Sequence, residues 1–88
     1  MSEYGEHFAT AVTAELRAQK ARKKISETAI ASDLGVHRVS ISRYFTGSRT
    51  ITMPVFADLC RVLDLDVLEV FTKAQITATK IERDCKRD

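Results

Sequence analysis

Apolar residues recur at helical spacing along most of the chain. From about Glu6 to Lys24, apolar positions follow one another at steps of three and four, which predicts a helix with one buried stripe. Comparable spacing predicts four further helices, the last two beginning near Met53 and just after Asp66. The connections between these segments are short, so we expect an all-α fold of five helices.

One serine and two glycines predict where the central helices begin and end. Ser26 can accept a hydrogen bond from a free amide of the next turn, so it is expected to cap a short helix that ends at Leu34. Gly35 and Gly47 can adopt the left-handed backbone conformation that ends a helix. Between them we expect a second short helix, from about Arg38 to Thr46.

The last two helices also carry start signals. Pro54 is compatible with the first turn of a helix that ends near Leu63, because first-turn amides have no acceptor within the helix. Asp66 and Glu69 have the spacing of a capping box, with Asp in place of Ser or Thr. They mark the start of a fifth helix that extends toward Lys86.

The two short helices around Gly35 form the most specific pattern in the chain. A short helix, a three-residue turn that begins with glycine, and a second short helix describe a helix-turn-helix unit, whose second helix lies in the major groove of DNA. Ala31 would let the two helices approach closely, and Ile41 would fill the angle between them. One of Tyr44 and Phe45 is expected to point inward as well.

The segment from Ile25 to Gly47, with its Leu-Gly-Val…Ile-Ser-Arg…Gly pattern, resembles the phage repressor and Cro family of helix-turn-helix proteins, of the xenobiotic-response-element type. The segment from Phe56 to Phe71 is similar to the last two helices of that family. The resemblance covers roughly residues 8–71. It implies a lambda-repressor-like five-helix DNA-binding domain that binds a pseudo-palindromic operator as a dimer, here with a C-terminal helix extended over about residues 72–88.

The resemblance also implies which side chains read DNA bases. Arg38 and Val39 fall where the family places its first base-reading side chains, and Arg43 falls one turn further along. Arg38 could donate two hydrogen bonds to guanine, and Val39 could pack against a thymine methyl group. Ser42 shares a helix face with Arg38 and could touch a base or a phosphate. The alternatives are that both arginines contact only phosphates, that Val39 is partly buried, and that Ser42 is merely solvated.

Contacts to the DNA backbone are expected from basic and hydroxyl side chains near helix ends, where free amides also collect. The candidates are Lys23, Lys24, Thr28, His37, Thr46, Ser48 and Arg49.

Glu27 departs from the family pattern, which commonly has Gln at this position in contact with the DNA backbone and the first recognition residue. A carboxylate that faces phosphate would repel it. Glu27 could turn toward Arg38 and orient it, or the domain could dock differently. A third possibility is that Glu27 only interacts with the helix dipole.

The charge distribution favours a polyanionic partner. The net charge is only +2, yet residues 17–49 carry eight Lys or Arg residues against two acidic ones. The segments on either side are neutral or acidic. A basic middle is typical of nucleic-acid binding, although it could also be a solvated surface.

A heptad pattern continues beyond the resemblance in the C-terminal helix. Its positions are Val67, Phe71, Ala74, Ala78, Ile81 and Cys85. The pattern predicts a homodimer joined through this helix. The alternative is that Phe71 and Ala74 close the core of the single chain.

The chain lacks the residue patterns of an enzyme, a metalloprotein or a membrane protein. Cys60 and Cys85 are far apart and have no metal-ligand spacing, so both thiols are expected to be reduced and structural. No apolar run is long enough to span a bilayer. We therefore expect one cytoplasmic domain over residues 1–88, with no catalytic residues, cofactor or metal.

Two functions follow from these patterns. The first is a sequence-specific regulator that binds double-stranded DNA and represses transcription as a dimer by occupying its operator. The alternative is an antitoxin-like DNA-binding module whose C-terminal helix holds a protein partner.

Overall fold

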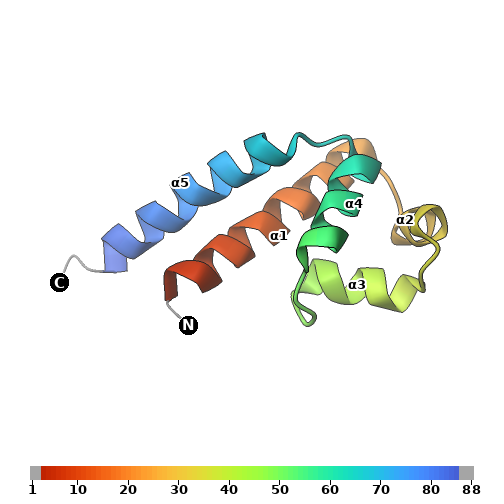
Figure 1. Cartoon of the computed structure of the whole chain (residues 1–88), viewed down its shortest axis with the longest axis horizontal. Coiled ribbons are helices and arrows are strands. Elements are labelled where there is room, and N and C mark those ends of the chain that lie inside the picture. Colours follow the sequence, from red (N-terminus) through yellow and green to blue (C-terminus); the bar gives the residue numbers. More distant parts are fainter. Residues whose placement is uncertain (1–2, 86–88) are drawn as a thin grey trace.

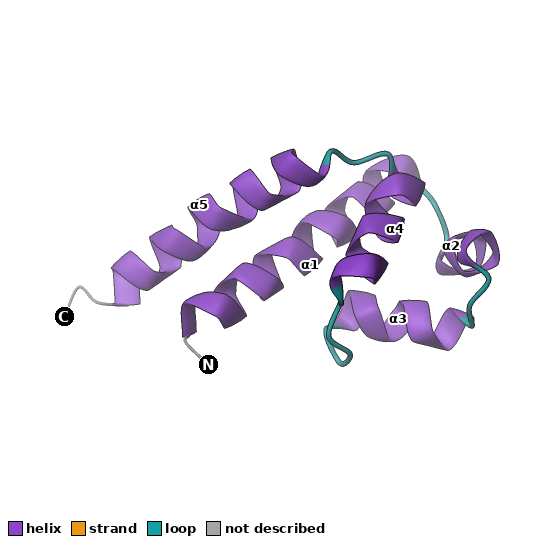
Figure 2. Cartoon of the chain, viewed as in Figure 1, coloured by secondary structure: helices purple, strands orange, loops and turns teal. Residues whose placement is uncertain are grey.

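The computed structural model describes residues 3–85, and over this range the backbone forms five α-helices joined by short loops (Figure 2). They are α1 (Glu3–Lys23), α2 (Glu27–Leu34), α3 (Arg38–Thr46), α4 (Met53–Leu63) and α5 (Val67–Cys85). The all-α prediction is confirmed. Helix α1 begins three residues before the predicted start, and the predicted extension to Lys86 lies outside the described residues.

The two longest helices, α1 and α5, lie side by side and run in opposite directions (Figure 1). The three shorter helices gather at the C-terminal end of α1, and the N-terminal end of α1 and the C-terminal end of α5 lie on the far side of the molecule from α2. The shape is therefore elongated, with extents of 47 × 22 × 20 Å.

Local signals set the ends of the short helices as predicted. Ser26 Oγ accepts a hydrogen bond of 3.0 Å from the amide of Ala29, so it caps α2. Gly35 and Gly47 have φ angles of 69° and 84°, in the left-handed region that glycine adopts without a steric penalty. These two residues end α2 and α3.

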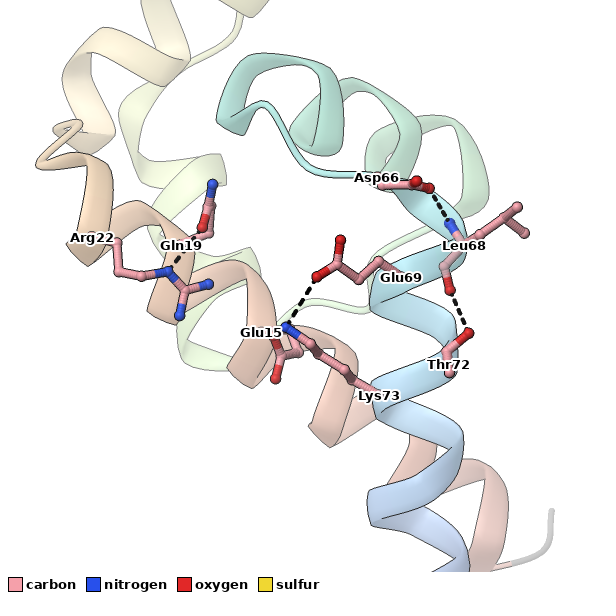
Figure 3. A network of polar contacts seen from close by, with 8 residues as sticks. All are labelled: Glu15, Gln19, Arg22, Asp66, Leu68, Glu69, Thr72 and Lys73. Carbon is pink, nitrogen blue, oxygen red and sulfur yellow. Dashed lines mark hydrogen bonds and ion pairs between the residues drawn. The ribbon is translucent and has the colours of Figure 1, made fainter.

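The capping box at the start of α5 is only half formed. Asp66 Oδ1 accepts a hydrogen bond of 2.9 Å from the amide of Leu68, as expected of an N-cap. The Glu69 carboxylate instead lies 3.3 Å from Lys73 Nζ, one turn further along the helix. Lys73 Nζ also lies 4.0 Å from Glu15 on α1, so Glu69 joins a charged group between α1 and α5 (Figure 3).

All five helices contribute to one hydrophobic core. Its fully buried members include Leu16 on α1, Ile30 on α2, Ile41 on α3, and Leu59 and Leu63 on α4.

Tyr44 and Phe45 are both buried, whereas the sequence pattern placed only one of them inward. Tyr44 packs toward the turn and α4, while Phe45 faces Lys20 on α1. Helix α3 is thus enclosed on two sides.

Aromatic rings join α1, α4 and α5. The rings of Phe56 and Phe71 stack with their centroids 4.9 Å apart, and Phe8 lies 5.7 Å from Phe71. Contacts of this kind stabilise a core by more than the burial of their apolar surface alone would.

The structure corrects the predicted dimer seam for two of its residues. Ala74 and Ala78 are fully buried within the single chain, where α5 packs along α1. Their small side chains let the two helices of one chain approach closely, so they are not available to a second chain. Val67, Phe71 and Ile81 are half-buried, and the side chain of Cys85 lies outside the described residues.

We expect Leu16→Ala to lower the free energy of unfolding by about 2–5 kcal/mol, because it leaves a cavity in the centre of the core. Urea denaturation followed by circular dichroism measures the loss. Met53→Ala is the matched control, since Met53 is 66% exposed, and should change stability by less than about 0.5 kcal/mol. Equal effects of the two substitutions would contradict this description of the core.

The thiol of Cys60 should be unreactive in the folded protein. Burial of the side chain, and secondarily the charge of Asp66, raises the pKa of Cys60, which disfavours the nucleophilic thiolate. In a Cys85→Ser background, a thiol reagent should label Cys60 at mildly alkaline pH only after urea unfolds the chain. Rapid labelling of the native protein would show that Cys60 is accessible.

Candidate nucleic-acid interface

Helix α3 presents one face to the core and the other to solvent. Ile41, Tyr44 and Phe45 are buried, whereas Arg38 and Arg43 are exposed. In Figure 1 the helix lies at the edge of the molecule, on the side away from α5. The outer face of α3 is therefore free to contact a large partner.

Three of the four predicted base-reading residues share this outer face. The side chain of Arg38 is 59% exposed and Val39 is 52% exposed. Arg43 is exposed as well, and its side chain has no hydrogen-bond or ion-pair partner among residues 3–85. Ser42 is half-buried, so it offers a smaller surface than its neighbours. Val39 is exposed over about half of its surface, so the alternative in which it is partly buried stays open.

Glu27 turns toward the start of α3. Its Oε1 atom lies 3.9 Å from Arg38 Nη1, and its side chain is only 25% exposed. Because Glu27 is the first residue of α2, its carboxylate also lies at the positive end of that helix dipole. This geometry fits both the arrangement in which Glu27 orients Arg38 and the one in which Glu27 interacts with the helix dipole.

Helix α1 anchors the C-terminal end of α3. Arg17 Nη1 donates a hydrogen bond of 3.2 Å to the Phe45 carbonyl oxygen, and Lys20 Nζ lies 5.6 Å from the centre of the Phe45 ring. The sequence pattern identified Arg17 and Lys20 only as part of the basic segment. No local signal pairs residues separated by 28 positions, so this anchor was missed.

The loop after α3 folds back onto the end of that helix. The Arg43 carbonyl oxygen accepts hydrogen bonds from Thr46 Oγ1 and the Arg49 amide, both at 3.2 Å, and a longer one of 3.5 Å from Ser48 Oγ. The Arg49 guanidinium lies 5.3 Å from the centre of the Tyr44 ring. The loop thus brings Thr46, Ser48 and Arg49 together, although the hydroxyl groups of Thr46 and Ser48 already have partners within the chain.

The remaining candidates for DNA-backbone contacts lie at other helix ends. Thr28 and His37 are exposed at the starts of α2 and α3, and the His37 side chain makes no capping hydrogen bond. Lys23 Nζ forms an ion pair of 3.2 Å with Asp64. Lys24 follows α1 in a left-handed conformation, with φ of 55°. Of these residues, His37 directly precedes α3 as its N-cap.

The exposed, basic outer face of α3 suits a groove in a polyanion. An exposed helix fits the major groove of B-DNA, which is about 12 Å wide. Within residues 3–85, no group of three His, Cys, Asp or Glu side chains could hold a metal ion. In the same range no helix has both the length and the apolar character needed to cross a membrane.

A short helix, a glycine turn and an exposed basic helix together define a helix-turn-helix DNA-binding domain. Comparison with known families agrees: residues 11–71 match the family described as a helix-turn-helix domain. The match covers more than half of the chain, and the chain belongs to this family. No curated protein and no solved structure matched it. The matched region ends inside α5, so the rest of that helix lies beyond it.

Proposed function

We propose that the chain binds double-stranded DNA in a sequence-dependent way, with α3 in the major groove, and represses transcription by occupying an operator. The observation that carries this proposal is the exposed outer face of α3, where Arg38, Val39 and Arg43 lie together. The resemblance to phage repressors and Cro supports a repressor in particular.

The chemistry of this face suits readout of base edges. The planar guanidinium of Arg38 can donate two parallel hydrogen bonds to O6 and N7 of guanine. Val39 offers an apolar contact for a thymine methyl group, and the side chain of Arg43 has no competing partner in the described part of the chain. Ser42 adds a smaller contact, because it is half-buried.

Contacts to phosphate would hold α3 in register on the duplex. Thr28 lies at the start of α2 and His37 directly before α3. Thr46, Ser48 and Arg49 lie at and just after the end of α3. Such contacts supply affinity that falls as salt rises, but they carry no sequence information by themselves. Repression by occupancy requires no further activity than tight binding at a promoter, so the proposal assigns the chain no enzymatic role.

The test compares binding to the intergenic DNA upstream of the chain's own gene with binding to a scrambled duplex, by fluorescence anisotropy at low and high salt. The wild-type protein should prefer the native duplex. Arg38→Ala should weaken binding to it. Arg38→Lys keeps the charge but loses the bidentate hydrogen bonding, so it should lower the preference for the native over the scrambled duplex by about 1–3 kcal/mol.

Arg38→Lys is also the matched control for charge. It should leave the affinity for the scrambled duplex and its dependence on salt close to the wild-type values. Equal, weak and strongly salt-dependent binding of the wild-type protein to both duplexes would refute base readout.

The proposal includes a homodimer, which would place two copies of α3 on the halves of a pseudo-palindromic operator. Since α1 covers Ala74 and Ala78, the surface left for a second copy is the outer face of α5, where Leu68 and Ile76 are 74% and 64% exposed. Glu69 and Arg83 lie seven residues before and after Ile76. In an antiparallel pair centred on Ile76, Glu69 of each copy would therefore face Arg83 of the other.

We expect Ile76→Glu to shift the protein toward a monomer in sedimentation equilibrium, because it places like charges at the centre of the pair. Met53→Glu is the control, since Met53 on α4 is equally apolar and 66% exposed. A dimer that survives Ile76→Glu, or that only Met53→Glu disrupts, would refute the α5 surface. A monomeric wild-type protein would favour the alternative in which α5 holds a different protein.

A further inference from the structure

Glu27 is an acidic side chain on a surface that should otherwise attract phosphate. Its carboxylate lies 3.9 Å from Arg38 Nη1 at the start of the exposed face of α3. Asp33, at the other end of α2, pairs at the same distance with Arg61 on α4, and its side chain is 53% exposed. The two acidic residues of α2 thus have similar partners, but only the partner of Glu27 belongs to α3.

We propose that Glu27 is a positioning residue that restricts Arg38 to base edges and thereby increases discrimination between DNA sequences. This inference rests on the proposed function, because it assumes that α3 enters the major groove. Nothing in the helix-turn-helix fold itself requires a carboxylate at this position.

The geometry limits what the guanidinium of Arg38 can reach. A free arginine at this position could swing to a phosphate, which would add affinity for every sequence alike. The Glu27 carboxylate attracts one edge of the guanidinium, and the remaining N–H donors stay available for a guanine.

The same carboxylate disfavours a phosphate beside Arg38. Because the Glu27 side chain is only 25% exposed, solvent screens its charge less than that of Asp33. Glu27 therefore weakens binding to all DNA, and more so in complexes where Arg38 would contact the backbone. Specificity of this kind comes from a penalty on wrong complexes as well as from attraction to the right one.

The experiment uses duplexes that the wild-type protein selects from a randomised library, and a scrambled duplex of the same composition. Glu27→Gln removes the charge with almost no change of shape, and Asp33→Asn is the matched control on the same helix. Anisotropy titrations over a range of salt concentrations give both affinities for each variant. Circular dichroism melts show that each variant is folded.

Glu27→Gln should tighten binding to the scrambled duplex more than to the selected one, so that their affinity ratio falls by about fivefold or more. Its binding to the scrambled duplex should depend more steeply on salt, because Arg38 gains a phosphate contact. Asp33→Asn should shift both affinities alike and leave the ratio unchanged. A repeated selection with Glu27→Gln should yield a broader base preference.

If Glu27 acts by positioning Arg38, the effect of Glu27→Gln requires Arg38, whereas a general effect of charge does not. In an Arg38→Ala background, Glu27→Gln should no longer change the affinity ratio. The inference is overturned if Glu27→Gln behaves like Asp33→Asn, or if its effect persists without Arg38. A wild-type protein without sequence preference would refute the proposed function as well. If Arg38→Ala removes discrimination while Glu27→Gln matches Asp33→Asn, only this inference fails.

Discussion

Burial of one stripe of α1 holds the other helices in place. The buried side chains of this stripe, Leu16 above all, contribute to the core that all five helices share. Helix α1 also supplies donors to carbonyl groups that helix ends leave without an internal partner. Arg17 donates to Phe45 at the end of α3, and Gln19 Nε2 donates to Leu63 at the end of α4, at 3.0 Å. Apolar and polar contacts of α1 thus position the same elements.

This arrangement explains how a helix of nine residues can present a defined face. An isolated helix of that length is not stable in water, so its order must come from tertiary contacts. Tyr44 and Phe45 fix the inner side of α3, and Arg17 fixes its C-terminal end. At the other end, Glu27 and the glycine turn connect α3 to α2. Because these contacts hold α3 in place, the residues of its outer face are not required for stability and can serve binding.

The features that could be predicted from the sequence depend on local backbone physics. Ser26, Gly35 and Gly47 set helix ends through their own conformation or nearest amides, and all three act as predicted. Features that depend on which distant helix or residue makes a contact were harder to predict. A heptad stripe on α5 shows that the helix packs against another one, but it does not show whether that helix belongs to the same chain. Likewise, no local rule pairs Arg17 with Phe45 or directs Glu69 to Lys73.

The pairing of α1 with α5 also bears on the order in which the protein folds. These helices are the first and last elements of the described chain, so their contact closes a loop that contains everything between them. Contacts between α2 and α3 are close in sequence and cost little chain entropy to form. The groove left along α1 is filled only once Ala74 and Ala78 have been synthesised. On the ribosome, the turn between α2 and α3 can therefore form early, while the framework that holds it is completed only after α5 has emerged.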